Sequence, residues 1–158
     1  MANIVAEGKA HSSLLCRVHT RLCALPLAQV IETMRPLPIE PIADAARFVC
    51  GVAVIRGVPV PVVDAARLLG TEEEPHPARF VTLRTGTRRI ALAVTGVLGI
   101  RAIPDEAVQQ LPPLLRDAGA DVVAAIGRLD SELLLVLRSL RIIPNELWAT
   151  IEAQEPLA

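Results

Sequence analysis

Two prolines interrupt an apolar segment in the first half of the chain and restrict what it can form. In GVPVPVV, residues 57–63, Pro59 and Pro61 alternate with valines. Proline cannot lie inside a helix, and in a sheet it removes a hydrogen-bond donor. Backbone nitrogens two residues apart point to the same side of a strand, so both missing donors lie along one edge. The segment is therefore predicted to be an edge strand, protected against indiscriminate strand addition.

Short apolar segments separated by turn residues make up most of the remaining sequence. The alternation predicts β-hairpins at residues 14–25, 79–94 and 122–137, with further strands at 30–35 and 48–55. Arg56 and Gly57 form the predicted turn before the proline strand, and Asp64 is placed to cap a short helical turn. The other predicted segments are a linker at 71–78, a proline-interrupted connection at 103–119 and a C-terminal helix at 145–154.

An internal repeat groups these elements into two halves. Residues 15–31 align without gaps on residues 82–98 at a shift of 67 positions, and the match places Arg17 on Arg84 and Arg21 on Arg88. A weaker match relates residues 62–70 to residues 135–143. A repeat of this size, built from short antiparallel strands, favours two small β-barrels over one sandwich.

Composition excludes several classes of function. The chain has 16 basic and 17 acidic residues and no basic block, which argues against nucleic acid as a partner. Its apolar runs are far shorter than a membrane span, and its first residues lack a signal-peptide pattern, so we expect no membrane insertion and a cytoplasmic location. Only Phe48, Phe80 and Trp148 are aromatic, and the core is therefore expected to be aliphatic.

The residues that could carry chemistry do not form a recognisable catalytic set. His11, His19 and His76 lie in a predicted tail, a turn and a linker, and no phosphate-binding loop or nucleophile motif is present. Cys16, His19 and Cys23 could be imagined as metal ligands, but they supply only three donors. The alternative is that the two thiols are apolar residues flanking a hairpin turn. We therefore expect no enzyme activity, no cofactor and no metal.

The segment GVAVIRGVPVPVVDAARLLG, residues 51–70, resembles the signature of CheW-type chemotaxis adaptor domains. Upstream, residues 23–42 are similar to the family's Ala-Leu-Pro-x-x-x-Val-x-Glu stretch, and downstream, residues 90–100 resemble its Leu-Val-Asp-x-Val-hydrophobic-Gly segment. Thr95 stands where the family often has Asp, and Arg138 replaces another acidic position. The resemblance covers about residues 13 to 144.

The resemblance implies a mainly β fold with two SH3-like five-stranded barrels, short helical turns and a C-terminal helix. Residues 13–144 would form a domain of two intertwined barrel subdomains, with a flexible tail at 1–12 and a C-terminal helix and tail at 145–158. It also implies a non-catalytic adaptor that couples the cytoplasmic tip of chemoreceptors to a CheA-type histidine kinase.

Two charged residues stand out within the apolar β segments. Glu32, in VIETMR, and Arg56, at the hairpin tip beside Gly57, both lie on positions of the family motif. We interpret them as a charge pair at or beside the receptor-binding surface, fixing orientation and partner choice more than affinity. The alternative is a solvated strand end and a turn arginine, because exposed ion pairs contribute little to stability.

The proline strand is apolar on both faces. Val58, Val60 and Val62 alternate on one face, with Pro59, Pro61 and Val63 on the other. One face can line a barrel, while the other either packs on the second barrel or offers a groove to a receptor helix. We assign Val58, Val60 and Val62, together with Glu32, Arg56 and Gly57, to the expected protein-binding surface.

Two other functions remain open from the sequence. Within the family, the chain could serve a chemotaxis-like pathway that controls pili, gliding or another output. From a different class, it could be a two-barrel domain that binds a small ligand or acts as an enzyme.

Overall fold

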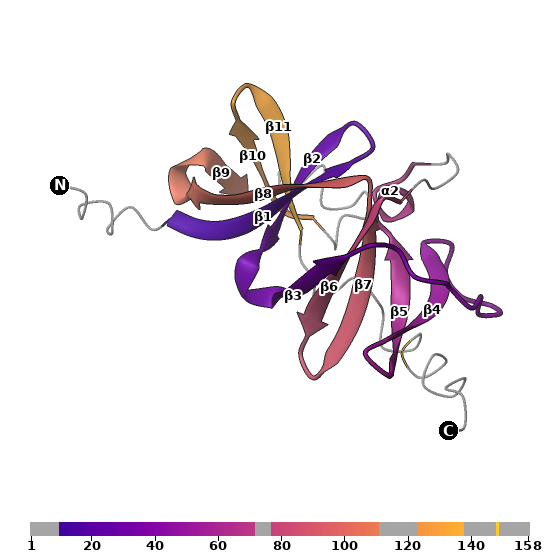
Figure 1. The fold of residues 1–158 in the computed structure, drawn as a ribbon. Coiled ribbons are helices and arrows are strands. Elements are labelled where there is room, and N and C mark those ends of the chain that lie inside the picture. Colours follow the sequence, from indigo (N-terminus) through magenta and orange to yellow (C-terminus); the bar gives the residue numbers. More distant parts are fainter. Residues whose placement is uncertain (1–9, 72–76, 111–122, 138–147, 149–158) are drawn as a thin grey trace.

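The strands that the structure describes form two β-sheets, and the chain passes from one sheet to the other more than once (Figure 1). The structure is a computed structural model, and it describes residues 10–71, 77–110, 123–137 and Trp148. The first sheet has the order β8 (Gly96–Pro104), β1 (Ala10–Val18), β2 (Arg21–Pro26), β11 (Glu132–Leu137), β10 (Val123–Leu129) and β9 (Val108–Gln110). The second sheet has the order β3 (Val30–Met34), β6 (Arg79–Thr85), β7 (Arg88–Val94), β5 (Val58–Asp64) and β4 (Val49–Ile55).

This architecture confirms the expected fold class, a mainly β protein with two subdomains. All three predicted hairpins form, as β1–β2, β6–β7 and β10–β11. Two strands were missed: β8 follows the second predicted hairpin and pairs with β1, and β9 lies in the predicted connection and pairs with β10. The first sheet therefore has six strands and not five. β1 begins at Ala10, inside the segment expected to be a tail. Of the predicted C-terminal helix, only Trp148 lies within the described residues.

The sequence repeat has a structural counterpart. The β1–β2 hairpin and the β6–β7 hairpin occupy the middle of their respective sheets, and each is followed by a strand that crosses to the other sheet. β3 pairs with β6, whereas β8 pairs with β1. Each sheet also adds a parallel strand beside its hairpin, β11 on β2 and β5 on β7. In each case the strand that follows the hairpin of one subdomain belongs to the sheet of the other, and this connects the two subdomains.

The two outer hairpins turn in the same way. Arg56 and Gly57 join β4 to β5 with φ angles of 52° and 78°, and Asp130 and Ser131 join β10 to β11 with φ angles of 50° and 70°. Two consecutive residues with positive φ are typical of the tight turns that match the twist of paired strands. Sequence reasoning identified the Arg56 turn because it contains glycine.

The proline strand is an edge strand only in part. β4 pairs along the length of β5, with Val52 opposite Pro61 and Val54 opposite Pro59. On the other side, β7 pairs with Val62, Val63 and Asp64 alone. The proline half of β5 thus has one paired side, as predicted, but the strand as a whole lies between two neighbours. The sequence analysis did not predict that β7 pairs in parallel with β5, at the residues that follow the two prolines.

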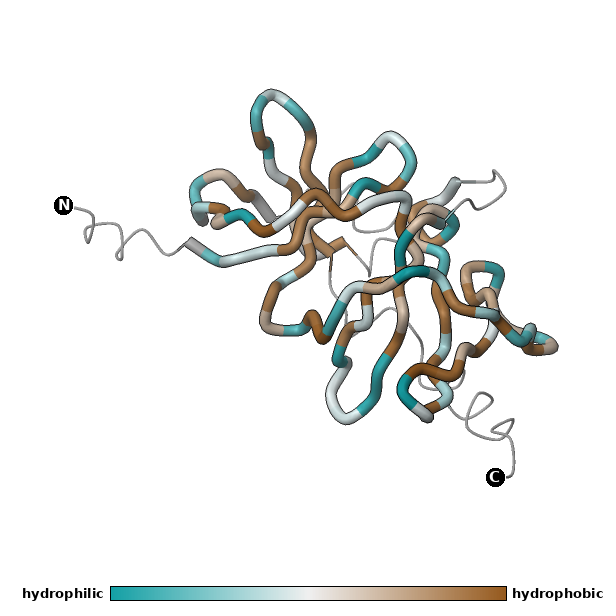
Figure 2. The backbone as a smooth tube through the Cα atoms, viewed as in Figure 1, coloured by the Kyte–Doolittle hydropathy of each residue, from teal (hydrophilic) through white to brown (hydrophobic). Residues whose placement is uncertain are grey.

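In the described part of the chain, the apolar side chains form three cores, one on each sheet and one between the sheets. Figure 2 shows hydrophobic segments converging where the two sheets meet, with hydrophilic residues at the hairpin turns. The shared core includes Leu25, Val63, Leu83, Ile90, Leu92 and Trp148. The second sheet's own core contains Phe80, Ala91, Val60 and Val62, and that of the first contains Leu15, Ala24, Ile103 and Leu134. Apart from Phe80 and Trp148, the residues named in these cores are aliphatic, as the composition predicted.

Polar contacts at the junction hold the sheets in place. Helix α2 (Ala65–Leu68) begins at Asp64, whose carboxylate accepts a hydrogen bond from the Ala66 amide at 3.1 Å, and this confirms the predicted cap. Arg21 donates to the Leu69 carbonyl oxygen at 2.8 Å, which links β2 to the end of α2. Thr95 accepts a hydrogen bond from the His19 amide at 2.9 Å. This contact joins the β1–β2 turn to the residue between β7 and β8.

Candidate protein-binding surface

Glu32 and Arg56 form an ion pair in the second sheet. Arg56 donates from Nε to Glu32 Oε2 at 2.8 Å and from Nη2 to Oε1 at 2.7 Å, so both carboxylate oxygens are occupied. Glu32 lies on β3, at one edge of the sheet, and Arg56 follows β4, at the other edge. The ion pair therefore brings the two edges of the sheet together, as a barrel requires.

This pair is ionised at neutral pH. The hydrogen bonds from Arg56 hold the pKa of Glu32 below its ordinary value of 4.5, and the charges of Arg56 and Arg89 add to this lowering. A lowered carboxyl pKa contributes stability that is present above the unfolded-state pKa. That contribution is lost only as the pH falls through the lowered value in the folded protein. The side chain of Arg56 is 71% exposed, so water and salt screen much of the interaction.

Two valines flank the turn that carries Arg56. Val54, on β4, is 60% exposed, and Val58, on β5, is 45% exposed. Val54 is opposite Pro59 and Val58 is opposite Ile55, so the two valines lie on opposite faces of the hairpin, on either side of its tip. Gly57 is exposed as well, and a side chain added there would meet open space. Exposed branched apolar residues beside an oriented charge pair are suited to contact with another protein. Of the expected surface residues, Glu32, Arg56, Gly57 and Val58 are brought together at this end of the sheet.

Val60 and Val62 do not belong to that surface. They are 2% and 0% exposed and lie in the core of the second sheet with Phe80 and Ala91. The expectation that they contact a partner is wrong, because their face of β5 points into the sheet's own core. The opposite face, with Val63, packs in the core between the sheets. The alternative of ordinary packing between the barrels is thus correct for Val63.

Sequence reasoning missed Val54. Its neighbours Ala53 and Ile55 are buried, so strand alternation places Val54 on the outer face of β4. The alternation of β4 could have predicted that Val54 shares a face with Val52, but the sequence alone does not determine which face of β4 is buried. The buried side became clear only once β4 was paired with β5.

The first sheet has a similar hairpin end at the β10–β11 turn, but the charged residue in that turn is acidic. Arg101, on β8, lies 3.6 Å from Asp130 in the β10–β11 turn, and Arg17, on β1, forms an ion pair with Glu132. Leu133, beside this turn, is exposed. Both sheets therefore end in a hairpin tip with an ion pair and an exposed apolar residue. The tip residue is a cation in the second sheet and an anion in the first.

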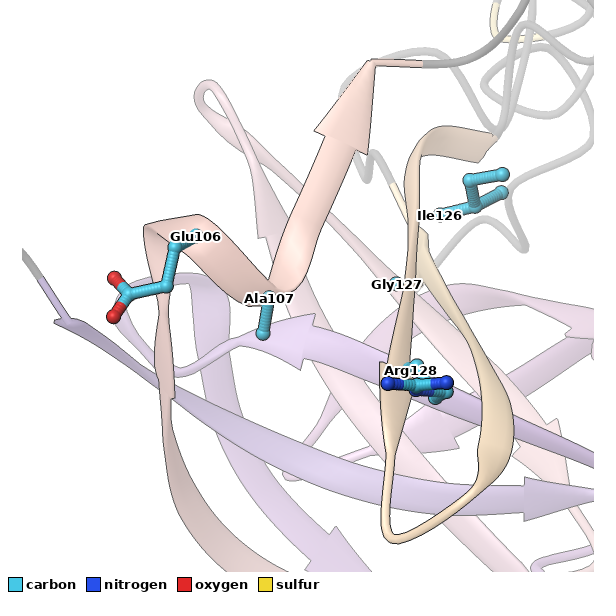
Figure 3. Close-up of a pocket in the computed structure, with 5 residues that line it drawn as sticks. All are labelled: Glu106, Ala107, Ile126, Gly127 and Arg128. Atoms are coloured by element: carbon cyan, nitrogen blue, oxygen red, sulfur yellow. The ribbon is translucent and has the colours of Figure 1, made fainter.

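A cavity of about 490 Å³ opens between η2 (Asp105–Ala107) and β10. Glu106, Ala107, Ile126, Gly127 and Arg128 line it. Figure 3 shows the side chains of Glu106 and Arg128 pointing in different directions from different elements. These two charged groups do not converge on one point, as a general acid and base would have to.

The two cysteines of the first hairpin face each other in the core. Cys16 and Cys23 are opposite each other in the β1–β2 register, and both are completely buried. Burial raises the pKa of each thiol to about 12. His19 does not join them: within the described residues, no group of three His, Cys, Asp or Glu side chains is arranged to hold a metal ion. Here the apolar interpretation of the two thiols agrees with the structure.

Thiol titration checks this assignment. In the folded protein at pH 8, we expect a thiol reagent such as Ellman's reagent to modify at most Cys50, which is only partly buried. All three cysteines should react after denaturation. Rapid modification of two or three thiols in the native protein would contradict the buried placement of Cys16 and Cys23.

No helix in the described part of the chain is long and apolar enough to cross a membrane.

Comparison with known proteins identifies the family. Residues 12–146 match the family model of the CheW-like domain. The chain is 31% identical over 132 residues to Protein FrzA of Myxococcus xanthus, covering 78% of this chain and 81% of that protein. It is 26% identical over 102 residues to the probable chemotaxis protein CheW of Rhizobium etli, covering 63% and 66% of the two chains.

The fold has a solved counterpart. The crystal structure of the scaffolding protein TtCheW from Thermoanaerobacter tengcongensis superposes with a TM-score of 0.73 at 19% identity, covering 82% of this chain and 89% of that one. Together with the two exchanged sheets and the motif at residues 51–70, these matches lead to one conclusion. The chain belongs to the CheW-like family.

Proposed function

We propose that this protein is a non-catalytic adaptor that couples chemoreceptors to a CheA-type histidine kinase. The observation that carries the proposal is the end of the second sheet, where exposed Val54 and Val58 flank the ion pair of Arg56 with Glu32. Such a surface offers apolar area and a charge of fixed orientation, which together support specific binding between proteins.

An adaptor needs two surfaces, and the two sheets provide two ends. The end of the second sheet presents Arg56 with exposed valines, and the end of the first presents Asp130 with exposed Leu133. Opposite signs at the two tips favour different partners, because like charges facing each other across an interface are unfavourable. One end would contact the receptor and the other the kinase.

The paired surfaces give a direct binding test. Replacing Val54 and Val58 with serine should weaken binding to one partner by roughly tenfold or more, since each valine contributes about 1 kcal/mol on burial. Binding to the other partner should not change. Leu133→Ser should give the reverse pattern, so each variant is the control for the other.

Isothermal titration calorimetry with the regulatory domain of the cognate kinase and a soluble receptor fragment measures both affinities. Wild-type protein that binds neither partner would refute the adaptor role. Loss of both affinities in one variant would refute the assignment of one partner to each end.

A second candidate function is an adaptor of a chemotaxis-like pathway with another output, such as pili or gliding. The relative that is 31% identical bears the name FrzA and not CheW, and this supports the second candidate. The partners would be a receptor and kinase of that pathway. Deleting the gene and recording swimming separately from surface movement distinguishes the two outputs.

A further inference from the structure

Two arginines at equivalent positions of the sequence repeat lie at the edge of the core between the sheets. The shift of 67 positions places Arg21, the first residue of β2, on Arg88, the first residue of β7. Each arginine shares a strand face with a buried residue of the shared core, Cys23 in β2 and Ile90 in β7. The two arginines therefore have the same place in their respective sheets, and their contacts can be compared directly.

Arg21 holds the end of the short helix that follows β5. Its Nη1 atom donates a hydrogen bond to the Leu69 carbonyl oxygen at 2.8 Å, and Leu69 is the residue at which α2 ends. β5 belongs to the second sheet, whereas β2 belongs to the first. The hydrogen bond therefore attaches a segment that leaves the second sheet to a strand of the first.

Arg88 holds Trp148 in the corresponding way. The guanidinium carbon of Arg88 lies 4.8 Å from the centre of the Trp148 ring, which is within the range of a cation–π interaction. Trp148 is 7% exposed and belongs to the shared core. In sequence it comes after β11, the parallel strand of the first sheet, and it lies beyond residues 12–146, which match the family model. This contact attaches a residue that follows the first sheet to a strand of the second.

We propose that the contacts Arg21–Leu69 and Arg88–Trp148 fix the orientation of the two sheets relative to each other. Each contact joins one sheet to the segment that follows the parallel strand of the other, so the two contacts act in opposite directions across the junction. The two hairpin tips that carry ion pairs lie on different sheets, and their relative placement depends on the same contacts. A role in signalling rests on the proposed adaptor function. Arg21 and Arg88 are then positioning residues, because they act through Leu69 and Trp148 and not through contact with a partner.

A double-mutant cycle tests the contact of Arg88 with Trp148. Arg88→Gln should lower the thermal midpoint by about 2 to 4 °C, and should have no further effect in a Trp148→Leu protein. Arg88→Lys keeps a cation above the ring and should recover most of the shift. Arg79→Gln, at the opposite end of β6 from the hairpin turn, is the matched control and should not change the midpoint. An equal shift from Arg88→Gln with and without Trp148 would overturn the proposal.

Fluorescence reports the same contact independently of stability. Trp148 is the only tryptophan of the chain, so the emission of the folded protein comes from this residue alone. Acrylamide should quench it weakly in wild-type protein and more strongly in Arg88→Gln, with Arg88→Lys close to wild type. Strong quenching in the folded wild-type protein would contradict the burial of Trp148.

The contact of Arg21 with Leu69 is tested by Arg21→Met, which keeps the length of the side chain and removes the donors. Loss of one hydrogen bond should lower the thermal midpoint by about 2 to 4 °C, as for Arg88→Gln. A midpoint equal to that of wild-type protein would overturn the equivalence of the two contacts.

Functional measurements separate this inference from the adaptor function. Below its thermal transition, Arg88→Gln should bind the kinase regulatory domain and the soluble receptor fragment as tightly as wild-type protein. It should nevertheless transmit less receptor control to autophosphorylation of the cognate kinase, and Arg88→Lys should restore that control. Wild-type protein that binds neither partner would refute the adaptor function, while the double-mutant cycle still decides the contact. Normal receptor control with Arg88→Gln would overturn the positioning role alone.

Discussion

Replacing Gly51 with alanine should lower the free energy of unfolding by about 3 kcal/mol or more, through combined backbone strain and overpacking. Gly51 has a φ of 147°, and an added Cβ atom would lie 2.1 Å from the carbonyl oxygen of Glu40. That segment is fixed by two backbone hydrogen bonds of 2.8 Å between Glu40 and Val52. The clash cannot be relieved without breaking this bridge. Urea unfolding followed by circular dichroism measures the loss.

Gly99 provides the matched control for the backbone conformation. Its φ is 120°, but an added Cβ atom there would have no neighbour within 4 Å. Gly99→Ala should therefore cost only the conformational part, about 1 to 2 kcal/mol. Equal destabilisation by the two variants would show that the close approach of Glu40 to Gly51 contributes nothing.

Reversing the charge of Arg56 is expected to have the largest effect on function. Arg56→Glu places two carboxylates where an ion pair holds the edges of the second sheet, and it inverts the charge of the hairpin tip. Because the Arg56 side chain is mostly exposed, the fold should persist, while affinity for the partner at this end falls about tenfold or more. Calorimetry gives the affinity, and circular dichroism confirms that the variant is folded.

Arg79→Glu makes the same chemical change at the far end of β6 and should bind both partners normally. If Arg56→Glu is folded and binds both partners as tightly as wild-type protein, the charge pair has no role in partner binding. The exposed valines would then be the remaining basis of the surface.

Local patterns predicted the strands and hairpins because the information lies in neighbouring residues. Val58 to Val63 alternate around two prolines, and Asp64 is followed by a short helical turn, so strand and cap could be read directly. The repeat also predicted two related subdomains. The pair of Glu32 with Arg56 was expected from the family motif, and their side chains form two hydrogen bonds.

What the sequence did not reveal depends on contacts between distant segments. The parallel pairing of β7 with β5 and of β11 with β2 joins strands from different hairpins, and no local pattern encodes it. For the same reason, the assignment of Val60 and Val62 to a partner surface was wrong. Alternation showed that they share a face, but only the closed sheet shows that this face is its interior.

If this protein couples a receptor to a kinase, as proposed, the coupling is visible in the activity of the kinase. Autophosphorylation of the cognate kinase is followed with receptor membranes, with and without this protein, and with and without the receptor's stimulus. The adaptor account predicts that receptors control the kinase only when the protein is present, and that Arg56→Glu reduces this control. Kinase activity that responds to the receptors to the same degree without the protein would contradict the account.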